Sequence, residues 1–263
     1  MSEYVFRMTI EAPRIAKSRK AGHFVIIRVG EGGERIPLTI ADADVGLGTI
    51  SLIVQIVGCT TAKLSKLKEG DFISDIVGPL GNATHIEKVG AVLCAGGGVG
   101  IAPLYPIVQE LKRAGNRVIT VLAARNAGLM ILQKEMTDFS DEVIIMTDDG
   151  SLGKKGLVTD GMEEVIQREK IDQAVVIGPA VMMKFAALTT KKYNIPTIAS
   201  LNTIMVDGTG MCGACRCTAG DKTKFVCVDG PEFDAHQVNF DEIIQRLSAY
   251  KNEETTAYQQ YLS

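Results

Sequence analysis

The chain has 263 residues, of which 46% are hydrophobic and 22% charged, and its net charge is −3. That length predicts two or three domains rather than one small core. The nearly balanced charge gives no basis for a nucleic-acid or anionic-membrane partner, and we expect neither. The first residues alternate in strand fashion, and no later apolar run approaches the roughly 18 residues of a membrane span, so we expect a cytoplasmic protein without a secretory signal.

The N-terminal region, residues 1–89, has the pattern of β structure. Short apolar runs with strand character lie at 22–29, 49–57 and 71–79, and glycine-rich turns separate them. In the second of these runs, TISLIVQIV, apolar side chains occupy alternate positions and therefore one strand face. Several short strands without strong helical periodicity predict a small antiparallel barrel.

The pattern changes at residue 90. Runs rich in β-branched residues lie at 91–96, 117–124, 142–149 and 173–178. Stretches with helical spacing alternate with them, and the first has apolar residues from Leu104 to Leu111 at i, i+3, i+4 and i+7. Alternating strands and helices over 90–200 predict a parallel sheet covered on both faces.

The loop AGGGVGIAP joins the first of those strands to the first helix. Its glycines would let the backbone approach a pyrophosphate, and the following helix would present unpaired N–H groups to it. The loop does not match G-x-G-x-x-G, and the second strand ends in Arg125 where an acidic residue would hold a ribose. A glycine-rich turn without a ligand is the alternative. From its position we predict a dinucleotide site that includes Gly96, Gly97, Gly98 and Gly100.

Two further loops end strands at the same edge of the predicted sheet, where ligands bind in such folds. Gly178 and Pro179 end the fourth strand and open a helix. The loop TDDGSLGKKG ends the third strand and makes Asp148, Asp149 and Gly150 available to a nicotinamide ribose. The shared edge favours a bound ligand over three unrelated turns.

The order of these motifs resembles a known family. ERIPLTIAD, GPLGNAT, AGGGVGIAPLYPI, TDDGSLGKKG, GPAVMM and then a cysteine cluster follow the pattern of the ferredoxin-NADP reductase superfamily. The resemblance covers nearly the whole chain and is closest to the branch represented by the electron-transfer subunit of dihydroorotate dehydrogenase. It implies an α+β multi-domain fold with an antiparallel β-barrel for FAD over 1–89, an α/β domain for NAD(H) over 90–200, and a [2Fe–2S] module with a C-terminal tail over 201–263.

The resemblance also implies contacts to FAD. Arg35 matches the family arginine that pairs with the FAD pyrophosphate, a task that suits its planar fork. An exposed strand charge is the alternative for an isolated arginine. Thr39 occupies the hydroxyl position near the reactive nitrogen of the flavin. The other residues assigned to FAD are Pro37 and Leu38 in the same motif, and Gly81, Asn82 and Thr84 in GPLGNAT, which a plain inter-domain turn would resemble.

The C-terminal cysteines have the spacing of a metal cluster. Asp207, Cys212, Cys215 and Cys227 follow the C-x4-C-x2-C…C pattern of plant-type [2Fe–2S] sites, with aspartate in the first position. Zinc is the rival metal and would use Cys217 with the other three cysteines, although the C-x2-C-x-C crowding is awkward for a tetrahedral site. The flavin and nicotinamide motifs favour the iron cluster, because a flavin reduced by a nicotinamide needs an acceptor that takes single electrons.

Asp207 taken alone has the context of a turn aspartate, V-D-G-T-G. The dihydroorotate-type subunits carry cysteine at the matching position. The small subunit of NADH-dependent ferredoxin:NADP oxidoreductase, also described as sulfide dehydrogenase, instead holds its cluster with one aspartate and three cysteines. This second resemblance implies that Asp207 is a ligand and Cys217 is not. Cys59 and Cys94 fit small core residues, and the three histidines share no spacing.

The resemblance implies a subunit of an electron-bifurcating oxidoreductase that passes hydride between NAD(H) and FAD and single electrons to the cluster. Its large partner subunit would hold a second FAD and [4Fe–4S] clusters, bind NADP(H) and interact with ferredoxin, giving a heterodimer. The alternatives are the electron-transfer subunit of an NAD-dependent dihydroorotate dehydrogenase and a non-catalytic metal-binding scaffold. Arg125 would also suit a 2′-phosphate, so the sequence leaves the choice between NAD and NADP open.

Overall fold

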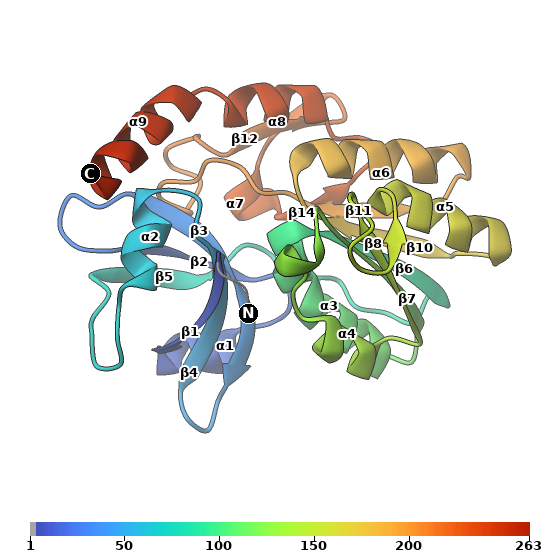
Figure 1. The fold of residues 1–263 in the computed structure, drawn as a ribbon, viewed down its shortest axis with the longest axis horizontal. Coiled ribbons are helices and arrows are strands. Elements are labelled where there is room, and N and C mark those ends of the chain that lie inside the picture. The colour runs from blue at the N-terminus through green and yellow to red at the C-terminus, as the bar shows by residue number, and fades with distance from the viewer. Residues whose placement is uncertain (1–3) are drawn as a thin grey trace.

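The computed structural model describes residues 4–263 and arranges them in three parts (Figure 1). The N-terminal β part, in blue, lies beside the α/β part, in green and yellow. The C-terminal segment, in orange and red, lies across the top of both. Within 4–263, no helix is both long and apolar enough to cross a membrane.

The N-terminal part is a five-stranded antiparallel sheet in the order β1-β4-β3-β2-β5. Its elements are β1 (Val5–Glu11), α1 (Pro13–Ser18), β2 (Phe24–Arg28), β3 (Arg35–Asp44), β4 (Thr49–Gln55), α2 (Cys59–Ser65) and β5 (Asp75–Leu80). The alternating apolar residues Ile50, Leu52 and Val54 of β4 are buried in its core. The pairing of β3 with β4 shifts register between Ile40 and Asp42, a bulge that bends the strand. The predicted antiparallel β region is confirmed.

The α/β part is a seven-stranded sheet in the order β14-β11-β10-β6-β7-β8-β9. Its elements are β6 (Ala91–Gly97), α3 (Ile101–Arg113), β7 (Arg117–Ala124), α4 (Gln133–Phe139), β8 (Glu142–Thr147), β9 (Lys154–Lys155), α5 (Val158–Arg168), β10 (Gln173–Ile177), α6 (Ala180–Lys192), β11 (Thr197–Ser200) and β14 (Glu232–Asp234), with short 3₁₀ turns at Gly98–Gly100 and Ala127–Leu129. All neighbours from β11 to β9 are parallel.

Both faces of this sheet are buried, as the continuous apolar runs predict. Val92 and Cys94 of β6 pack in one core with α3 and α4, and Leu93 and Ala95 pack in the other with α5 and α6. The apolar face of α3, from Leu104 to Leu111, packs into the first of these cores. The predicted parallel sheet with helices on both faces is confirmed.

The sequence did not predict the two strands β11 and β14. β14 lies beyond residue 200 and pairs antiparallel with β11, so that Glu232 stands opposite Ser200. A three-residue strand carries almost no periodic signal, and only its partner defines it. The C-terminal segment therefore supplies the edge strand of the α/β sheet.

The rest of the C-terminal segment forms a hairpin and three helices. Its elements are β12 (Arg216–Ala219), β13 (Lys222–Phe225), α7 (Val226–Asp229), α8 (Phe240–Leu247) and α9 (Lys251–Leu262). Asn239 caps α8, where its side-chain oxygen accepts from Glu242 N at 3.1 Å. Helix α9 returns to the N-terminal part and lies above α2 in Figure 1. There the Lys66 ammonium lies 4.4 Å from the centroid of the Tyr261 ring.

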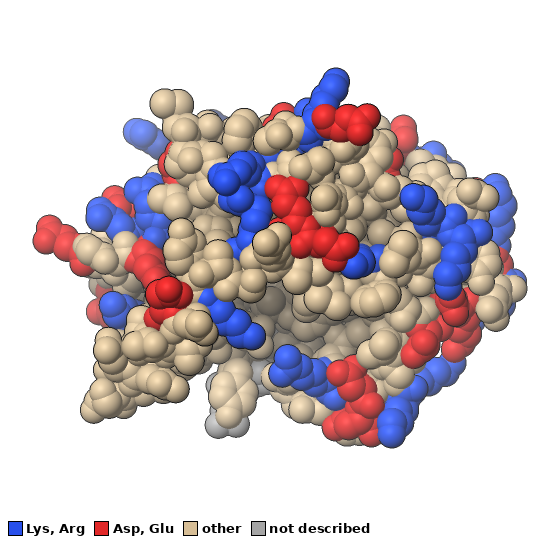
Figure 2. Space-filling model, turned by 90° about the horizontal axis from the view of Figure 1, so that it is seen from above, with Lys and Arg blue, Asp and Glu red and all other residues tan. Residues whose placement is uncertain are grey.

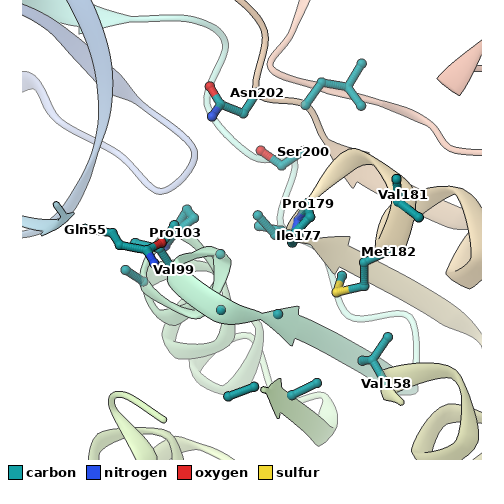
Figure 3. Close-up of a pocket in the computed structure, with 18 of the residues that line it drawn as sticks. Gln55, Val99, Pro103, Val158, Ile177, Pro179, Val181, Met182, Ser200 and Asn202 are labelled. Atoms are coloured by element: carbon teal, nitrogen blue, oxygen red, sulfur yellow. The ribbon is translucent and has the colours of Figure 1, made fainter. Parts of the chain in front are cut away.

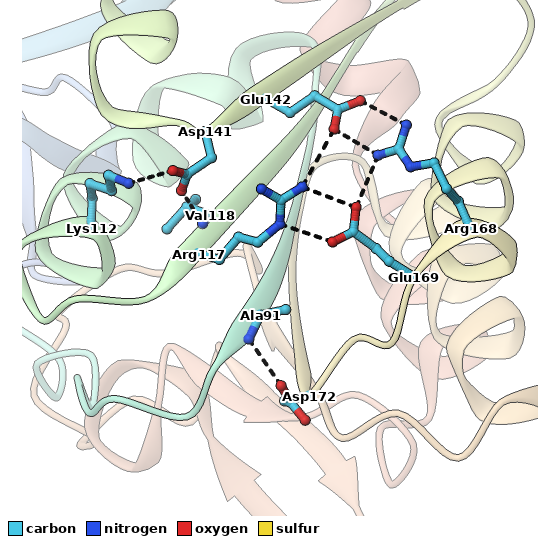
Figure 4. A network of polar contacts seen from close by, with 9 residues as sticks. All are labelled: Ala91, Lys112, Arg117, Val118, Asp141, Glu142, Arg168, Glu169 and Asp172. Atoms are coloured by element: carbon cyan, nitrogen blue, oxygen red, sulfur yellow. Dashed lines mark hydrogen bonds and ion pairs between the residues drawn. The ribbon is translucent and has the colours of Figure 1, made fainter.

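A polar network occupies the edge of the sheet where the parallel strands begin (Figure 4). Arg117 at the start of β7 pairs with Glu169, and Arg168 pairs with Glu142 at the start of β8. Asp172 accepts a hydrogen bond from Ala91 N at the start of β6, at 3.0 Å. These side chains are partly exposed, and exposed pairs of this kind each contribute little alone. The opposite edge, where the strands end, is left for ligands.

Candidate functional site

A cavity of about 1210 Å³ lies between the N-terminal sheet and the carboxyl edge of the α/β sheet. Figure 2 shows a recess between these two parts, with charges of both signs interspersed over that face. The cavity lies where β6 adjoins β10, the point at which the strand order reverses and doubly wound sheets bind their ligands. Ligand pockets usually measure roughly 300–1,000 Å³, so this one has room for more than a single small molecule.

The structure brings ten of the seventeen predicted flavin and nucleotide residues to this one cavity. Those that line it are Pro37, Leu38, Thr39, Gly97, Gly98, Gly100, Arg125, Asp148, Gly178 and Pro179. They come from β3, the β6–α3 loop, the ends of β7 and β8, and the β10–α6 loop. Predicted residues of the barrel therefore face predicted residues of the sheet, as transfer between a flavin and a nicotinamide requires.

Two glycines show why the β6–α3 loop needs its composition. A Cβ at Gly100 would lie 2.6 Å from the carbonyl oxygen of Ile177, so only glycine lets this loop approach the end of β10. Gly98 has a φ of +56° and open space where a side chain would be. The loop thus presents bare backbone to the cavity, which suits an incoming pyrophosphate.

The two aspartates of the loop after β8 have different surroundings. The Asp149 carboxylate accepts hydrogen bonds from the hydroxyl of Ser151 at 2.6 Å and its N–H at 2.9 Å, and these bonds hold the Asp149 pKa below its usual value. Gly150 follows with a φ of +76°. Asp148 lines the cavity. Asp148 is therefore better placed for a ligand than Asp149, which shapes the turn.

Arg35 lies on β3 on the same strand face as Pro37 and Thr39, because side chains two apart share a face. It does not belong to the cavity lining. Its Nε is buried, and within residues 4–263 it has no hydrogen-bond partner. A buried guanidinium N–H without an acceptor is unfavourable, so this atom fits an anionic ligand group such as a cofactor phosphate.

The predicted phosphate loop is engaged with the C-terminal segment. Asn82 donates from its backbone N–H to Gly230 O at 2.7 Å and from Nδ2 to Val228 O at 3.1 Å. The Thr84 hydroxyl donates to Glu232 Oε1 at 2.5 Å. Both residues line a second, smaller cavity of about 340 Å³ rather than the large one.

The four predicted cluster ligands fall into two pairs. Cys215 Sγ lies 3.2 Å from Cys227 Sγ, and both thiols are buried. Cys212 is exposed, and its N–H donates to Asp207 Oδ2 at 2.8 Å. Two pairs of donors, three from the 207–215 loop and Cys227 from α7, suit a cluster of two irons. Within the described residues, no three His, Cys, Asp or Glu side chains gather closely enough to hold a single metal ion.

Asp207 has a structural role that is already visible. Its other oxygen, Oδ1, accepts from Thr209 N at 2.7 Å. The backbone N–H of Thr209, followed by the groups of Cys212, holds the pKa of this carboxyl below its usual value. The side chain is therefore a carboxylate that holds a turn, and a carboxylate is also the form that binds iron. Whether it ligates remains a prediction.

The remaining cysteines of this segment have different surroundings. Cys217 on β12 is fully buried in the apolar core shared with α5 and α6, and burial raises its pKa to about 11. Burial, followed by its hydrogen bond with Cys215, raises the pKa of Cys227 to about 12. Iron binding at Cys227 would therefore have to displace a firmly held proton, which metal coordination does.

Sequence reasoning missed several residues that line the large cavity. Gln55 at the end of β4, and Ser200 and Asn202 at and after the end of β11, point into it in Figure 3. Apolar side chains such as Ile177 and Met182 line the same cavity. The β-branched run TIAS was the only local signal for β11, and its four residues were too few to suggest a strand.

Comparisons with known proteins agree with this arrangement. A family model described as the iron–sulfur cluster binding domain of dihydroorotate dehydrogenase B matches residues 202–239. One described as an oxidoreductase NAD-binding domain matches residues 95–187. The chain is 49% identical over 262 residues to a homolog of the electron transfer subunit of dihydroorotate dehydrogenase B (NAD(+)) from Thermotoga maritima, covering 100% of this chain and 93% of the relative.

Two further relatives cover most of the chain. The electron transfer subunit of dihydroorotate dehydrogenase B (NAD(+)) from Bacillus caldolyticus is 33% identical over 247 residues, covering 90% of this chain and 94% of the relative. A chain in a structure of NADH-dependent reduced ferredoxin-NADP oxidoreductase, studied for flavin-based electron bifurcation, has a TM-score of 0.94 at 48% identity, covering 100% of this chain and 95% of that chain. These matches confirm the predicted resemblance, fold class, oxidoreductase class and the cofactor set of FAD, a [2Fe–2S] cluster and NAD(H).

Proposed function

The chain belongs to the family of dihydroorotate dehydrogenase B-type electron-transfer subunits, and within that family we propose that it is the small subunit of an electron-bifurcating NADH-dependent ferredoxin:NADP oxidoreductase. It is an NAD(P)H-linked flavin and iron–sulfur oxidoreductase subunit. The observation that carries the finer proposal is Asp207 in the first ligand position, where the resemblance implies aspartate in the bifurcating small subunits and cysteine in the dihydroorotate-type subunits. The full-length similarity to a chain of the bifurcating enzyme supports it.

The residues of the N-terminal sheet would hold FAD. Arg35 would supply a guanidinium with a buried Nε for the pyrophosphate, and Pro37, Leu38 and Thr39 would supply the cavity wall beside the flavin ring. When bound, FAD supplies the exchange of a hydride for two single electrons. The Thr39 hydroxyl can donate to a flavin ring nitrogen, and the wall around it excludes water.

The residues at the carboxyl edge of the α/β sheet would hold NAD(H). The loop of Gly97, Gly98 and Gly100 approaches the pyrophosphate, and Asp148 accepts hydrogen bonds from ribose hydroxyls. Gly178 and Pro179 border the cavity at the end of β10. Because these loops face the wall formed by β3, the two ligands would meet inside the cavity.

The C-terminal loop would pass electrons to a large partner subunit. Asp207, Cys212, Cys215 and Cys227 are the proposed ligands, and Cys212 is the exposed one. Met211 beside it is 87% exposed, so the loop presents an apolar side chain where a partner would dock. The partner we propose holds a second flavin and [4Fe–4S] clusters, binds NADP(H) and interacts with ferredoxin.

Co-purification from the native host tests the partner. A tagged chain should retain a large flavin and iron–sulfur subunit, and the complex should reduce ferredoxin and NAD(+) together at the expense of NADPH. The relatives named as dihydroorotate dehydrogenase subunits make a dihydroorotate-oxidising partner the second candidate. Recovery of that partner would replace the bifurcating proposal. A visible spectrum without flavin bands would leave only a metal-binding scaffold.

NADH should reduce the flavin of this subunit much faster than NADPH does. The basis is the family role of this subunit, which is NAD(H) binding, and not a specific residue. Stopped-flow bleaching of the flavin with each nucleotide measures the preference. Equal or faster reduction by NADPH would assign Arg125, which lines the same cavity, to the 2′-phosphate.

A further inference from the structure

Two short segments meet at a place that we call the junction, defined as residues 81–84 and 228–232. The first leaves the N-terminal sheet after β5, and the second directly follows Cys227. Asn82 joins them by its backbone N–H and its side-chain amide, to Gly230 O and Val228 O. Thr84 joins them by its hydroxyl, to Glu232. The junction therefore connects the proposed flavin part to the proposed cluster part through side chains.

The junction packs into the wall of the large cavity. Gly81 has a φ of +77°, and a Cβ there would lie 2.8 Å from the Phe24 ring and 3.0 Å from Pro231. Phe24 and Pro231 both line the cavity. A shift of the junction would therefore move the wall of the cavity.

The junction also supports the cluster loop. A Cβ at Gly208 would lie 2.6 Å from Leu80 Cδ1, so the loop backbone packs directly against β5, one residue before the junction. On the other side, Leu201 N donates to Pro231 O at 2.8 Å. The loop, the cavity wall and the edge of the α/β sheet thus share one point of support.

The hydrogen-bond donors of the junction already donate to protein acceptors. A threonine hydroxyl carries one proton, and that of Thr84 is directed at Glu232. The Asn82 backbone N–H and one Nδ2 proton are likewise directed at the 228–230 carbonyls. A phosphate contact would have to compete with these bonds, and neither residue lines the large cavity.

We propose that Asn82 and Thr84 are positioning residues that set the separation of the flavin cavity from the cluster loop, and that they do not bind the FAD phosphates. This inference rests on the proposed placement of the cofactors. It assigns the two residues a role in electron transfer within the subunit, through the segment that follows Cys227.

The test compares Asn82→Ala and Thr84→Val in the full-length cofactor-loaded protein. Light-driven reduction of the flavin by a sacrificial donor starts the reaction, so failure of the NADH step would leave the measurement intact. The readout is the absorbance change as one electron leaves the flavin and one ferric iron becomes ferrous. Flavin and iron contents should match the wild type, while transfer becomes roughly threefold to tenfold slower, as expected for a site whose support loosens by less than about 1 Å.

A matched control separates this role from general loss of stability. Asn239→Ala removes a helix cap in the same segment but away from the junction, and should lower the Tm by roughly 2–4 °C without slowing transfer. Thr84→Ser keeps the hydroxyl and should restore the rate. Loss of flavin in Asn82→Ala or Thr84→Val would instead assign the residues to FAD. Wild-type transfer with a lowered Tm would make the junction purely structural.

Discussion

The α/β sheet and the cluster loop are held by different forces. In the sheet, Val92, Leu93 and Cys94 of β6 are each 0% exposed, with helices on both faces. In the loop, Met211 is 87% exposed and Cys212 is exposed. The sheet owes its shape to apolar burial, which needs no cofactor. The loop owes its shape to glycines and hydrogen bonds, which a metal cluster would have to reinforce.

This difference explains what holds the residues of each site in position. The nucleotide loops begin and end on buried strands, so their positions follow from the core. The cluster loop has Gly208, Gly210 and Gly213 at positive φ, and the carboxylate of Asp207 ties its turn. It depends on the junction and on its own ligands for support. Substitutions in the two regions should therefore fail in different ways.

The largest effect is expected in the core of the sheet. Leu104 on α3 is fully buried, and Leu104→Ala should lower the free energy of unfolding by about 2–5 kcal/mol through lost burial and a cavity. Denaturant unfolding measures it. Leu47→Ala, at a side chain that is 74% exposed, should stay within about 0.5 kcal/mol. Equal effects at both positions would contradict the burial argument.

The next effect concerns FAD at the edge of the N-terminal sheet. Arg35→Ala should weaken FAD binding by about 2–4 kcal/mol, or roughly 30- to 700-fold, because a charge-assisted bond is lost from an enclosed site. Flavin released on dilution measures it, while iron content should not change. Arg28, the strand neighbour of Arg35, already pairs with Asp75 and serves as the control. Full flavin occupancy in Arg35→Ala would remove Arg35 from the site.

Substitutions of Asp207 test which interactions hold the cluster loop. Asp207→Cys should keep a [2Fe–2S] cluster with a changed spectrum, because thiolate can replace carboxylate. Asp207→Ala should lose iron readily, since it removes a ligand and the acceptor for Thr209 N and Cys212 N. Asp207→Asn keeps an acceptor without the charge and separates the two roles. Electron paramagnetic resonance and iron content are the measurements.

Two outcomes would revise the ligand set. Iron retention and unchanged spectra in both Asp207→Cys and Asp207→Ala would show that Asp207 is a turn residue. Cys217 would then be the next candidate for the fourth ligand. Its full burial on β12 means that the hairpin would have to rearrange first.

The smallest effect is a pH dependence at the junction. Burial raises the pKa of Glu232 above its ordinary value of 4.5, against the hydrogen bond from Thr84, which lowers it. Because the pKa of Glu232 is raised in the folded state, the neutral carboxyl stabilises the fold fully below pH 4.5. This contribution to the free energy of unfolding is lost as the pH rises through the folded-state pKa. Glu232→Gln keeps the hydrogen bond without the charge. It should therefore gain stability over the wild type at neutral pH.

That gain should disappear as the pH falls to about 4.5, where the wild-type carboxyl becomes neutral too. Thermal unfolding at several pH values measures it. His85, Asp229 and Asp234 line the same small cavity and are left unchanged in the comparison. A pH-independent gain would assign the effect to packing instead of charge.

Local patterns were enough to predict much of the fold and of the site. Alternation in β4 predicts a strand, and the spacing from Leu104 to Leu111 predicts α3, because burial of one face selects residues at a regular period. The glycines of the β6–α3 loop indicate a close backbone approach in the same way. The spacing of Cys212, Cys215 and Cys227 marks a cluster because it matches the spacing of plant-type [2Fe–2S] sites.

Only the tertiary structure decided which residues meet across the chain. Thr84 and Glu232 are 148 residues apart, and no local period relates them. The same holds for β14, which is a strand only because β11 lies beside it, and for the orphaned Nε of Arg35. Sequence by itself determined the periodic elements, such as β4 and α3, and the chemistry of the donors, since both depend on neighbours in the chain. Packing decided that Asn82 and Thr84 hold the C-terminal segment, since hydrogen-bond partners are chosen by proximity in space.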